Sequence, residues 1–323
     1  MDMQDNHLPY GHQYPPPPQP AGWFLPTPRG ARYDHLARNG ATELWRPIAG
    51  TLLVAGAFFL MGVVVIVLGK VLELLLRLPA PTGTQLFGDP LFGLVFVLLS
   101  IAVVLPAVYG VTALVQRRRP GTLSSVAGRL RWRWMFMCAG VAVLALVLGQ
   151  TAQVVAFTLT GQAGEAVFTW EGWSGFVPAM IIVLLLVPFQ AATEEYMFRG
   201  WLLQAFGSRL GSPVWGIVLG SLAFASLHGY SWVGLIDVFS FGVVTGFLAV
   251  RTGGLEAPIA IHVINNVLAF GIASAAGKLE EALDQGAVPV PWQALVGTVV
   301  QLTVFTLGVL LLARKRSVAT LSA

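Results

Sequence analysis

The chain has 323 residues, of which 56% are hydrophobic and only 11% are charged, and its net charge is +4. Soluble globular domains carry about 25% charged residues, so this composition excludes a soluble domain of this size, whose surface so few charges could not cover. One cysteine, Cys138, excludes a disulfide framework and a cysteine-rich metal site.

Residues 1–46 differ in composition from the rest of the chain. They contain a run of prolines at 15–18, further prolines and glycines, and no apolar periodicity. Such segments stay disordered or partly polyproline II, so we expect a disordered Pro-rich cytoplasmic tail. The short apolar core of a signal peptide is missing from it, and we expect no cleavage.

Eight long apolar blocks follow, each near the ~20 residues that a helix needs to cross a bilayer. They predict an all-α fold, a polytopic transmembrane helix bundle over residues 47–313 followed by a basic cytoplasmic tail at 314–323. The fourth block is long and carries Pro188 and Gly200, which predicts a kink or a tilt. The blocks are 48–69, 91–115, 134–158, 176–206, 213–228, 234–250, 255–273 and 292–313.

Basic residues gather beside these blocks and orient them. Three clusters, within 117–119, 129–133 and 314–316, abut hydrophobic spans, and Lys and Arg accumulate in cytoplasmic loops. We therefore expect both termini to be cytoplasmic, in a multi-pass protein of the plasma membrane. This placement argues against nucleic-acid binding, which uses basic clusters on a folded soluble face. The opposite loops carry acidic residues, namely Glu165, Glu171, Glu280, Glu281 and Asp284.

Ionisable side chains are concentrated in the fourth to seventh spans. Each costs on the order of 2.5–3.5 kcal/mol at mid-bilayer on insertion scales, so a cluster of them indicates a functional site. The cluster consists of Glu194, Glu195, Arg199, His228, Asp237, Glu256 and His262, with Asn265 and Asn266 beside the last.

Glu194 and Glu195 begin the densest part of this cluster. On a helix, Glu195 and Arg199 are i,i+4 neighbours that can pair, whereas Glu194 points about 100° away. Pairing neutralises one carboxylate and leaves Glu194 free to act as a general base. The alternative for this segment alone is an interfacial salt bridge at a helix end.

Two histidines on separate spans can reach the depth of Glu194. His262 and Asn266 are i,i+4 neighbours and share one helix face, while His228 closes the fifth span. With a rise of ~1.5 Å per residue, all four side chains start roughly 12–24 Å from the cytoplasmic helix ends. Side-chain length and modest tilt can cover this spread, so a single site is predicted.

Three motifs in order carry a family resemblance. Glu194-Glu195-x-x-x-Arg199, Phe224-x-x-x-His228 and His262-x-x-x-Asn266 resemble the signature of the CAAX-protease and bacteriocin-processing (CPBP, Abi) family. These are intramembrane endopeptidases related to the type II CAAX prenyl endopeptidase. The resemblance covers residues 176–273, which form the expected catalytic core.

The resemblance implies a role for each matching residue. Glu194 would activate water that His228 helps to hold, and His262 and Asn266 would stabilise the oxyanion of the tetrahedral intermediate. Amide hydrolysis needs an activated water and donors aimed at the developing negative charge. Glu195 and Arg199 would support these groups, and the substrate would be a membrane-associated peptide or protein within the lipid bilayer.

The residues leave a metal and two other functions open. Glu194, His228 and His262 are a conceivable ligand set for Zn²⁺ with an open position for water, although no His-Glu-x-x-His motif is present. Because Asn266 suits an oxyanion site better than a zinc site, we favour the glutamate-led chemistry. The alternatives are a transporter, or a non-catalytic membrane scaffold or immunity protein, that uses the same polar cluster.

Overall fold

The computed structural model describes residues 22–41, 43–162, 170–284 and 289–323. Over these ranges the chain is helical, and β structure is limited to two isolated bridges, Arg32 with Leu321 and Ser125 with Gly254. The predicted all-α class is therefore confirmed. Glu165, one of the acidic loop residues expected above, lies outside the described ranges.

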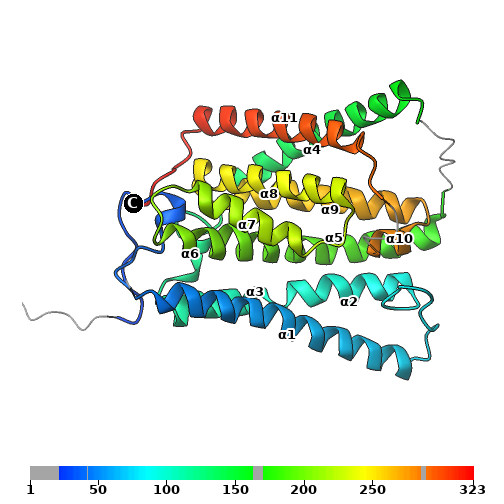
Figure 1. Cartoon of the computed structure of the whole chain (residues 1–323), viewed down its shortest axis with the longest axis horizontal. Coiled ribbons are helices and arrows are strands. Elements are labelled where there is room, and N and C mark those ends of the chain that lie inside the picture. Colours follow the sequence, from blue (N-terminus) through cyan, green and yellow to red (C-terminus); the bar gives the residue numbers. More distant parts are fainter. Residues whose placement is uncertain (1–21, 42, 163–169, 285–288) are drawn as a thin grey trace, which may run out of the picture.

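Long helices run side by side along the length of the molecule (Figure 1). Two 3₁₀ turns, η1 (Tyr33–His35) and η2 (Pro120–Leu123), lie near one end, and a π-helical turn, η3 (Tyr196–Leu202), joins α5 to α6. The helices are α1 (Trp45–Leu75), α2 (Pro90–Ala102), α3 (Leu105–Leu114), α4 (Trp132–Leu159), α5 (Trp173–Glu195), α6 (Leu203–Gly207), α7 (Val214–Ser226), α8 (Trp232–Thr252), α9 (Glu256–Ala275), α10 (Leu279–Leu283) and α11 (Ala294–Lys315).

Seven helical segments in the described part of the chain are long and apolar enough to cross a bilayer, against the eight spans predicted. The predicted span at 213–228 is α7, which has 13 residues and a length of only ~20 Å, against a hydrocarbon core of ~30 Å. Because α7 ends early, residues 227–231 leave the helix before α8 begins. Non-helical backbone at membrane depth is tolerated where it is buried in protein or lines a cavity.

The fourth span is irregular in the region where the sequence predicted a kink or a tilt. It runs as one apolar segment from Trp173 to Gly207, with Pro178 and Pro188 inside α5. The π-turn η3 follows immediately and contains Arg199 and Gly200. A π-turn re-aims the side chains of a helix and often occurs at functional sites. Here it begins directly after the two glutamates.

The prediction of a disordered tail is wrong for the described residues between 22 and 46. Tyr33 and Leu36 are fully buried in the core that also contains Leu123 and Trp201. The Tyr33 hydroxyl donates a hydrogen bond to the Leu123 carbonyl. Burying such apolar side chains outweighs the entropy that favours disorder. Residues 1–21, which hold the proline run, lie outside the described part, so their disorder stays a prediction.

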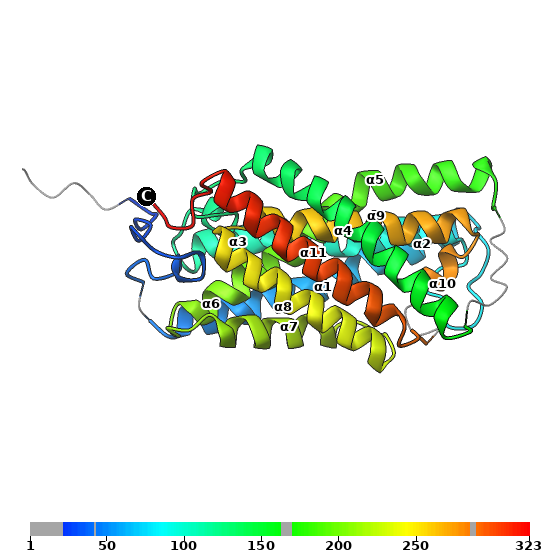
Figure 2. The ribbon, with the colours of Figure 1, turned by 90° about the horizontal axis from the view of Figure 1, so that it is seen from above.

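Both described ends of the chain lie at the same end of the bundle (Figure 2). The Gly30 amide donates to the Ser322 carbonyl at 2.9 Å, and Arg131 pairs with the buried Glu256 at 2.7 Å. The basic clusters next to the spans are at this end too, and we call it the termini end. Glu256, the first residue of α9, is therefore part of an ion pair at the termini end. It lies away from the other polar residues of the predicted cluster.

Candidate active site

Two adjacent carboxylates end helix α5, and both are buried. Glu195 is 0% exposed and Glu194 is 8% exposed. The Arg199 Nη1 donates to Glu195 Oε1 at 3.1 Å, one turn further along. The predicted pairing of Glu195 with Arg199 is confirmed, and the guanidinium binds Glu195 rather than Glu194.

The Arg199 guanidinium is fixed by more than this ion pair. It lies over the Phe224 ring, 4.2 Å from its centroid, and its side chain is 3% exposed. Aromatic faces attract guanidinium groups by a cation–π interaction. Arg199 thus connects the end of α5 to α7, the helix that precedes His228.

His262 of α9 lies between the two carboxylates. Its Nδ1 is 2.8 Å from Glu195 Oε1, and its Nε2 is 3.3 Å from Glu194 Oε2. A carboxylate that is paired with arginine accepts hydrogen bonds, so the Nδ1 proton points to Glu195. This hydrogen bond fixes the ring and leaves Nε2 facing Glu194.

His228 lies in the non-helical stretch after α7. Its Nδ1 is 2.9 Å from the Phe224 carbonyl oxygen, and because that oxygen can only accept, Nδ1 carries the proton. The imidazole also stacks on Tyr230, with centroids 5.8 Å apart and planes at 20°. The other ring nitrogen, Nε2, is then an acceptor in the neutral ring.

Asn266 is held by a residue that the sequence analysis missed. Its Nδ2 donates to Gln190 Oε1 at 3.0 Å. Gln190 is 5% exposed and lies one helical turn before Glu194. An amide in an apolar span, four residues before a candidate base, was a signal in the sequence that could have identified it.

The neighbouring polar residues Asn265 and Asp237 have partners outside this group. Asn265 Oδ1 accepts from Gln301 of α11 at 2.6 Å, and Asp237 Oδ1 accepts from the Thr298 hydroxyl at 2.8 Å. Asn265 and Asn266 thus have different hydrogen-bond partners, as expected from their different helix faces. Neither Asp237 nor Asn265 lines the cavity that contains Glu194.

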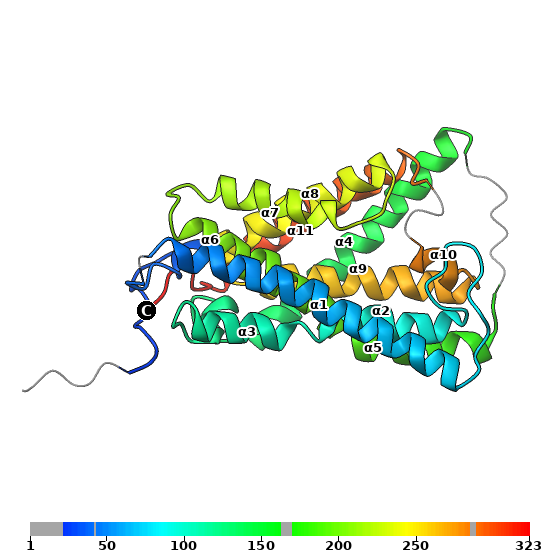
Figure 3. The same cartoon turned by 60° about the horizontal axis from the view of Figure 1, so that its bottom comes forward.

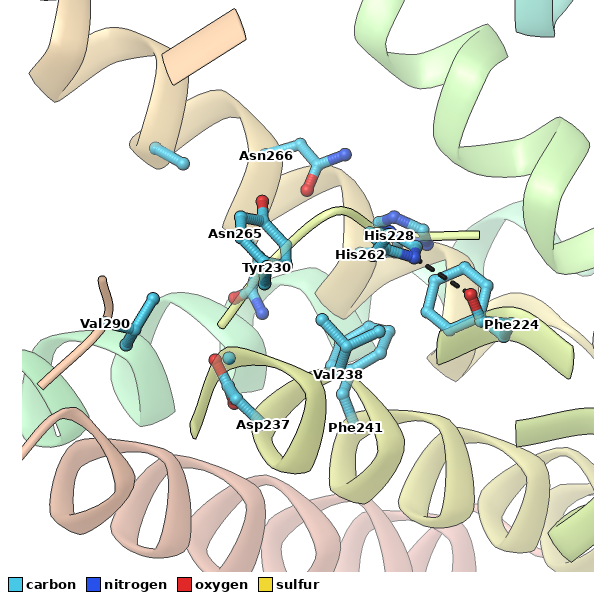
Figure 4. A pocket seen from close by; sticks show the side chains of 12 residues that line it. Phe224, His228, Tyr230, Asp237, Val238, Phe241, His262, Asn265, Asn266 and Val290 are labelled. Atoms are coloured by element: carbon cyan, nitrogen blue, oxygen red, sulfur yellow. Dashed lines mark hydrogen bonds between the residues drawn. The ribbon is translucent and has the colours of Figure 1, made fainter. Parts of the chain in front are cut away.

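The four residues predicted to act together line one cavity of about 460 Å³, which we call the site cavity. A second cavity of about 310 Å³ adjoins it and shares His228, His262 and Asn266 (Figure 4). Such volumes are typical of ligand sites. The polar residues of the site cavity near α5 are Gln190, Glu194, His228, Tyr230, His262 and Asn266.

The same residues do not fit a zinc site. Among the described residues, no group of three or more His, Cys, Asp or Glu side chains gathers as metal ligands would. The Zn²⁺ ligand set that the sequence left open is therefore not supported by the described residues.

Fold and site together define a multi-pass helical membrane protein with a buried Glu/His/Asn centre. Residues 173–268 match the family model described as type II CAAX prenyl endopeptidase Rce1-like. The matched segment begins with α5, includes α7 and α8, and contains every predicted site residue. The resemblance predicted from the three motifs is thereby confirmed over this segment.

Two relatives extend the comparison. The chain is 26% identical over 242 residues to the uncharacterized protein YyaK of Bacillus subtilis (strain 168), covering 71% of this chain and 78% of YyaK. It is 33% identical over 90 residues to an uncharacterized 24.3 kDa protein of Escherichia coli, covering 27% of this chain and 42% of that protein. No solved structure matches the chain.

Proposed function

We propose that this chain is an intramembrane endopeptidase of the plasma membrane that hydrolyses a peptide bond of a membrane-associated substrate. One observation carries the proposal: Glu194 and His262 are in contact at 3.3 Å and share a cavity with His228 and Asn266. An activated water, a proton acceptor and oxyanion donors are what amide hydrolysis requires. The match to the Rce1-like family supports the same class of reaction.

In this proposal Glu194 and His228 activate the water. Among the described residues, Glu194 has no arginine partner at hydrogen-bond distance, whereas Glu195 has Arg199, so Glu194 is the carboxylate that can take a proton. The same water donates its other proton in a hydrogen bond to Nε2 of His228, so that Glu194 and His228 together hold it in place. The water oxygen bonds to the substrate carbonyl carbon while one of its protons passes to Glu194.

His262 then returns the proton. Its Nε2 faces Glu194 Oε2, and its Nδ1 is anchored by Glu195 Oε1 at 2.8 Å. Protonated Nε2 can donate to the oxyanion or to the departing nitrogen. When the C–N bond breaks, the proton that Glu194 removed from water goes to the leaving amine, which balances the reaction.

Asn266 supplies a neutral donor for the oxyanion. One of its two Nδ2 protons is directed to Gln190 Oε1, so the other is available and its direction is fixed. A donor that is oriented before the reaction stabilises the transition state without a reorganisation cost. Gln190 therefore acts as a positioning residue.

Transport remains the competing function, because a third cavity, also lined by polar side chains, adjoins this region. It has a volume of about 340 Å³, lies among α4, α8, α9 and α11, and is lined by Gln150, Asp237, Asn265 and Gln301 among others. Polar side chains at membrane depth can mark an ion or proton pathway. A transporter would use Glu194 without altering any peptide.

Replacing Glu194 with Gln separates these functions. We expect Glu194→Gln membranes to accumulate uncleaved peptides that wild-type membranes do not contain, as identified by mass spectrometry of matched cultures. Glu43→Gln is the control, because Glu43 is half-exposed at the termini end, outside the site cavity. Identical peptide profiles for wild type and Glu194→Gln would exclude hydrolysis, and a scaffold or transporter would remain.

A further inference from the structure

The site cavity extends well beyond the candidate catalytic residues. Its lining continues from His262 and Asn266 along α9 to Ala273 and Ala276, and then to Lys278, Glu281 and Asp284. Helix α10 lies at the end of the bundle opposite the described chain ends (Figure 3). The cavity therefore connects the buried centre with this far end of the bundle.

Toward the termini end the centre is closed by packed side chains. Tyr196, directly after the two glutamates, is 2% exposed, and its hydroxyl is 2.6 Å from that of Ser124 in the loop before α4. Phe198 and Leu255 belong to the same buried cluster. Among the described residues, those lining the site cavity include none from the loops of the termini end.

The charges show which end faces the cytoplasm. The described residues include every lysine and arginine of the chain, and three of them lie at the far end: Lys70, Arg77 and Lys278. The arginine-rich clusters beside the spans are all at the termini end. By the positive-inside rule the termini end is cytoplasmic, so the site cavity reaches the extracytoplasmic side.

We propose that the site is reached from the extracytoplasmic face and that its substrate is a peptide segment presented there. The nature of the substrate rests on the proposed function, whereas the direction of access does not. A prenylated tail at the cytoplasmic face would meet the packed cluster instead of the cavity. The substrate class is therefore an exported peptide or an extracytoplasmic segment of a membrane protein.

The walls of the cavity fit an extended peptide. The wall formed by α2 is apolar and consists of Val97, Leu98 and Ile101. The polar groups include Gln190 of α5 and Asn266 of α9. An extended segment places alternate side chains on opposite sides and has backbone groups to pair, which suits a cavity with one apolar wall and a set of polar side chains.

Thiol labelling tests the direction of access without any need for activity. Cys138 is the single native cysteine and is fully buried, so a Cys138→Ala background provides a chain without thiols. Into it we would place Ala273→Cys or Ala269→Cys in the cavity wall. The matched control is Ala319→Cys, exposed at the termini end. The probe is a membrane-impermeant maleimide, applied to right-side-out and inverted membrane vesicles.

We expect both cavity cysteines to react at least about tenfold faster in right-side-out vesicles, because labelling through the packed cluster would require local opening. The Ala319→Cys control should show the opposite preference. Faster labelling of the cavity cysteines in inverted vesicles, equal labelling in both, or none in either would overturn the proposal. If the cavity cysteines are labelled faster in right-side-out vesicles but the protein cleaves no peptide, the access route is supported and the hydrolytic function is refuted.

Discussion

At the scale of single residues, the site depends on which partner each polar group has. Glu194 and Glu195 are adjacent in sequence and both buried, but Arg199 binds only Glu195. His262 contacts both. Removing one partner from a buried charged network leaves the other uncompensated and costs more than the contact itself is worth. In the proposed mechanism, this asymmetry between the glutamates makes Glu194 the base and Glu195 the support.

Gln190 offers a test of positioning at this scale. Gln190→Met keeps the volume but removes the acceptor for Asn266, so the oxyanion donor loses its fixed direction. We expect kcat to fall by roughly 10-fold to 100-fold with KM nearly unchanged, less than the ~10²–10³-fold typical of deleting an oxyanion donor. Gln301→Met is the matched control, because Gln301 holds Asn265 on the other side. An equal loss of kcat in both variants would contradict the assignment.

The sequence predicted residue contacts well where they are local. The Glu195–Arg199 pair follows from helical periodicity within one turn, and it is present. The contact between His262 and Glu195 joins residues 67 positions apart, and it depends on how α5 and α9 rotate against each other. Spacing in one sequence does not contain that rotation, so this contact was not predicted.

At the scale of elements, two irregularities build the site. The π-turn η3 begins directly after Glu195, and α7 stops after 13 residues, so His228 and Tyr230 enter the cavity from non-helical backbone. Hydropathy predicted a full span at 213–228 because the residues of α7 are mostly apolar. Where an apolar helix ends inside the bundle is decided by packing and not by hydropathy.

The folded N-terminal segment gives a prediction at this scale. Tyr33 is fully buried, so Tyr33→Ala should lower the free energy of unfolding by about 3–5 kcal/mol, as for other large-to-small core changes. Tyr33→Phe loses only the hydrogen bond to Leu123 and should cost about 0.5–1.5 kcal/mol. Phe24→Ala, at a side chain 42% exposed, is the control. Denaturant unfolding in detergent micelles gives all three values, and equal stability of Tyr33→Ala and Phe24→Ala would refute the packing.

At the scale of the whole molecule, the two ends of the bundle differ. The termini end holds the basic clusters and a packed core, while the other end leads through the site cavity to the buried centre. The number of membrane spans in the described part of the chain, seven against the eight predicted, and the gathering of the basic clusters at one end were predicted closely from hydropathy and charge, because both depend on long stretches of sequence. The direction in which the cavity extends depends on the relative placement of α2, α5, α9 and α10, which only the three-dimensional structure supplies.

The central claim is that the Glu194 carboxylate activates water for peptide hydrolysis without a metal. The most direct measurement uses purified wild type and Glu194→Gln in lipid nanodiscs, with the peptide accumulated by the variant as substrate and a strong chelator in both samples. We expect wild type to cleave at its full rate and Glu194→Gln to lose on the order of 10²–10⁴-fold in kcat/KM, the contribution of a general base. Loss of wild-type cleavage in chelator, or undiminished cleavage by Glu194→Gln, would contradict the account.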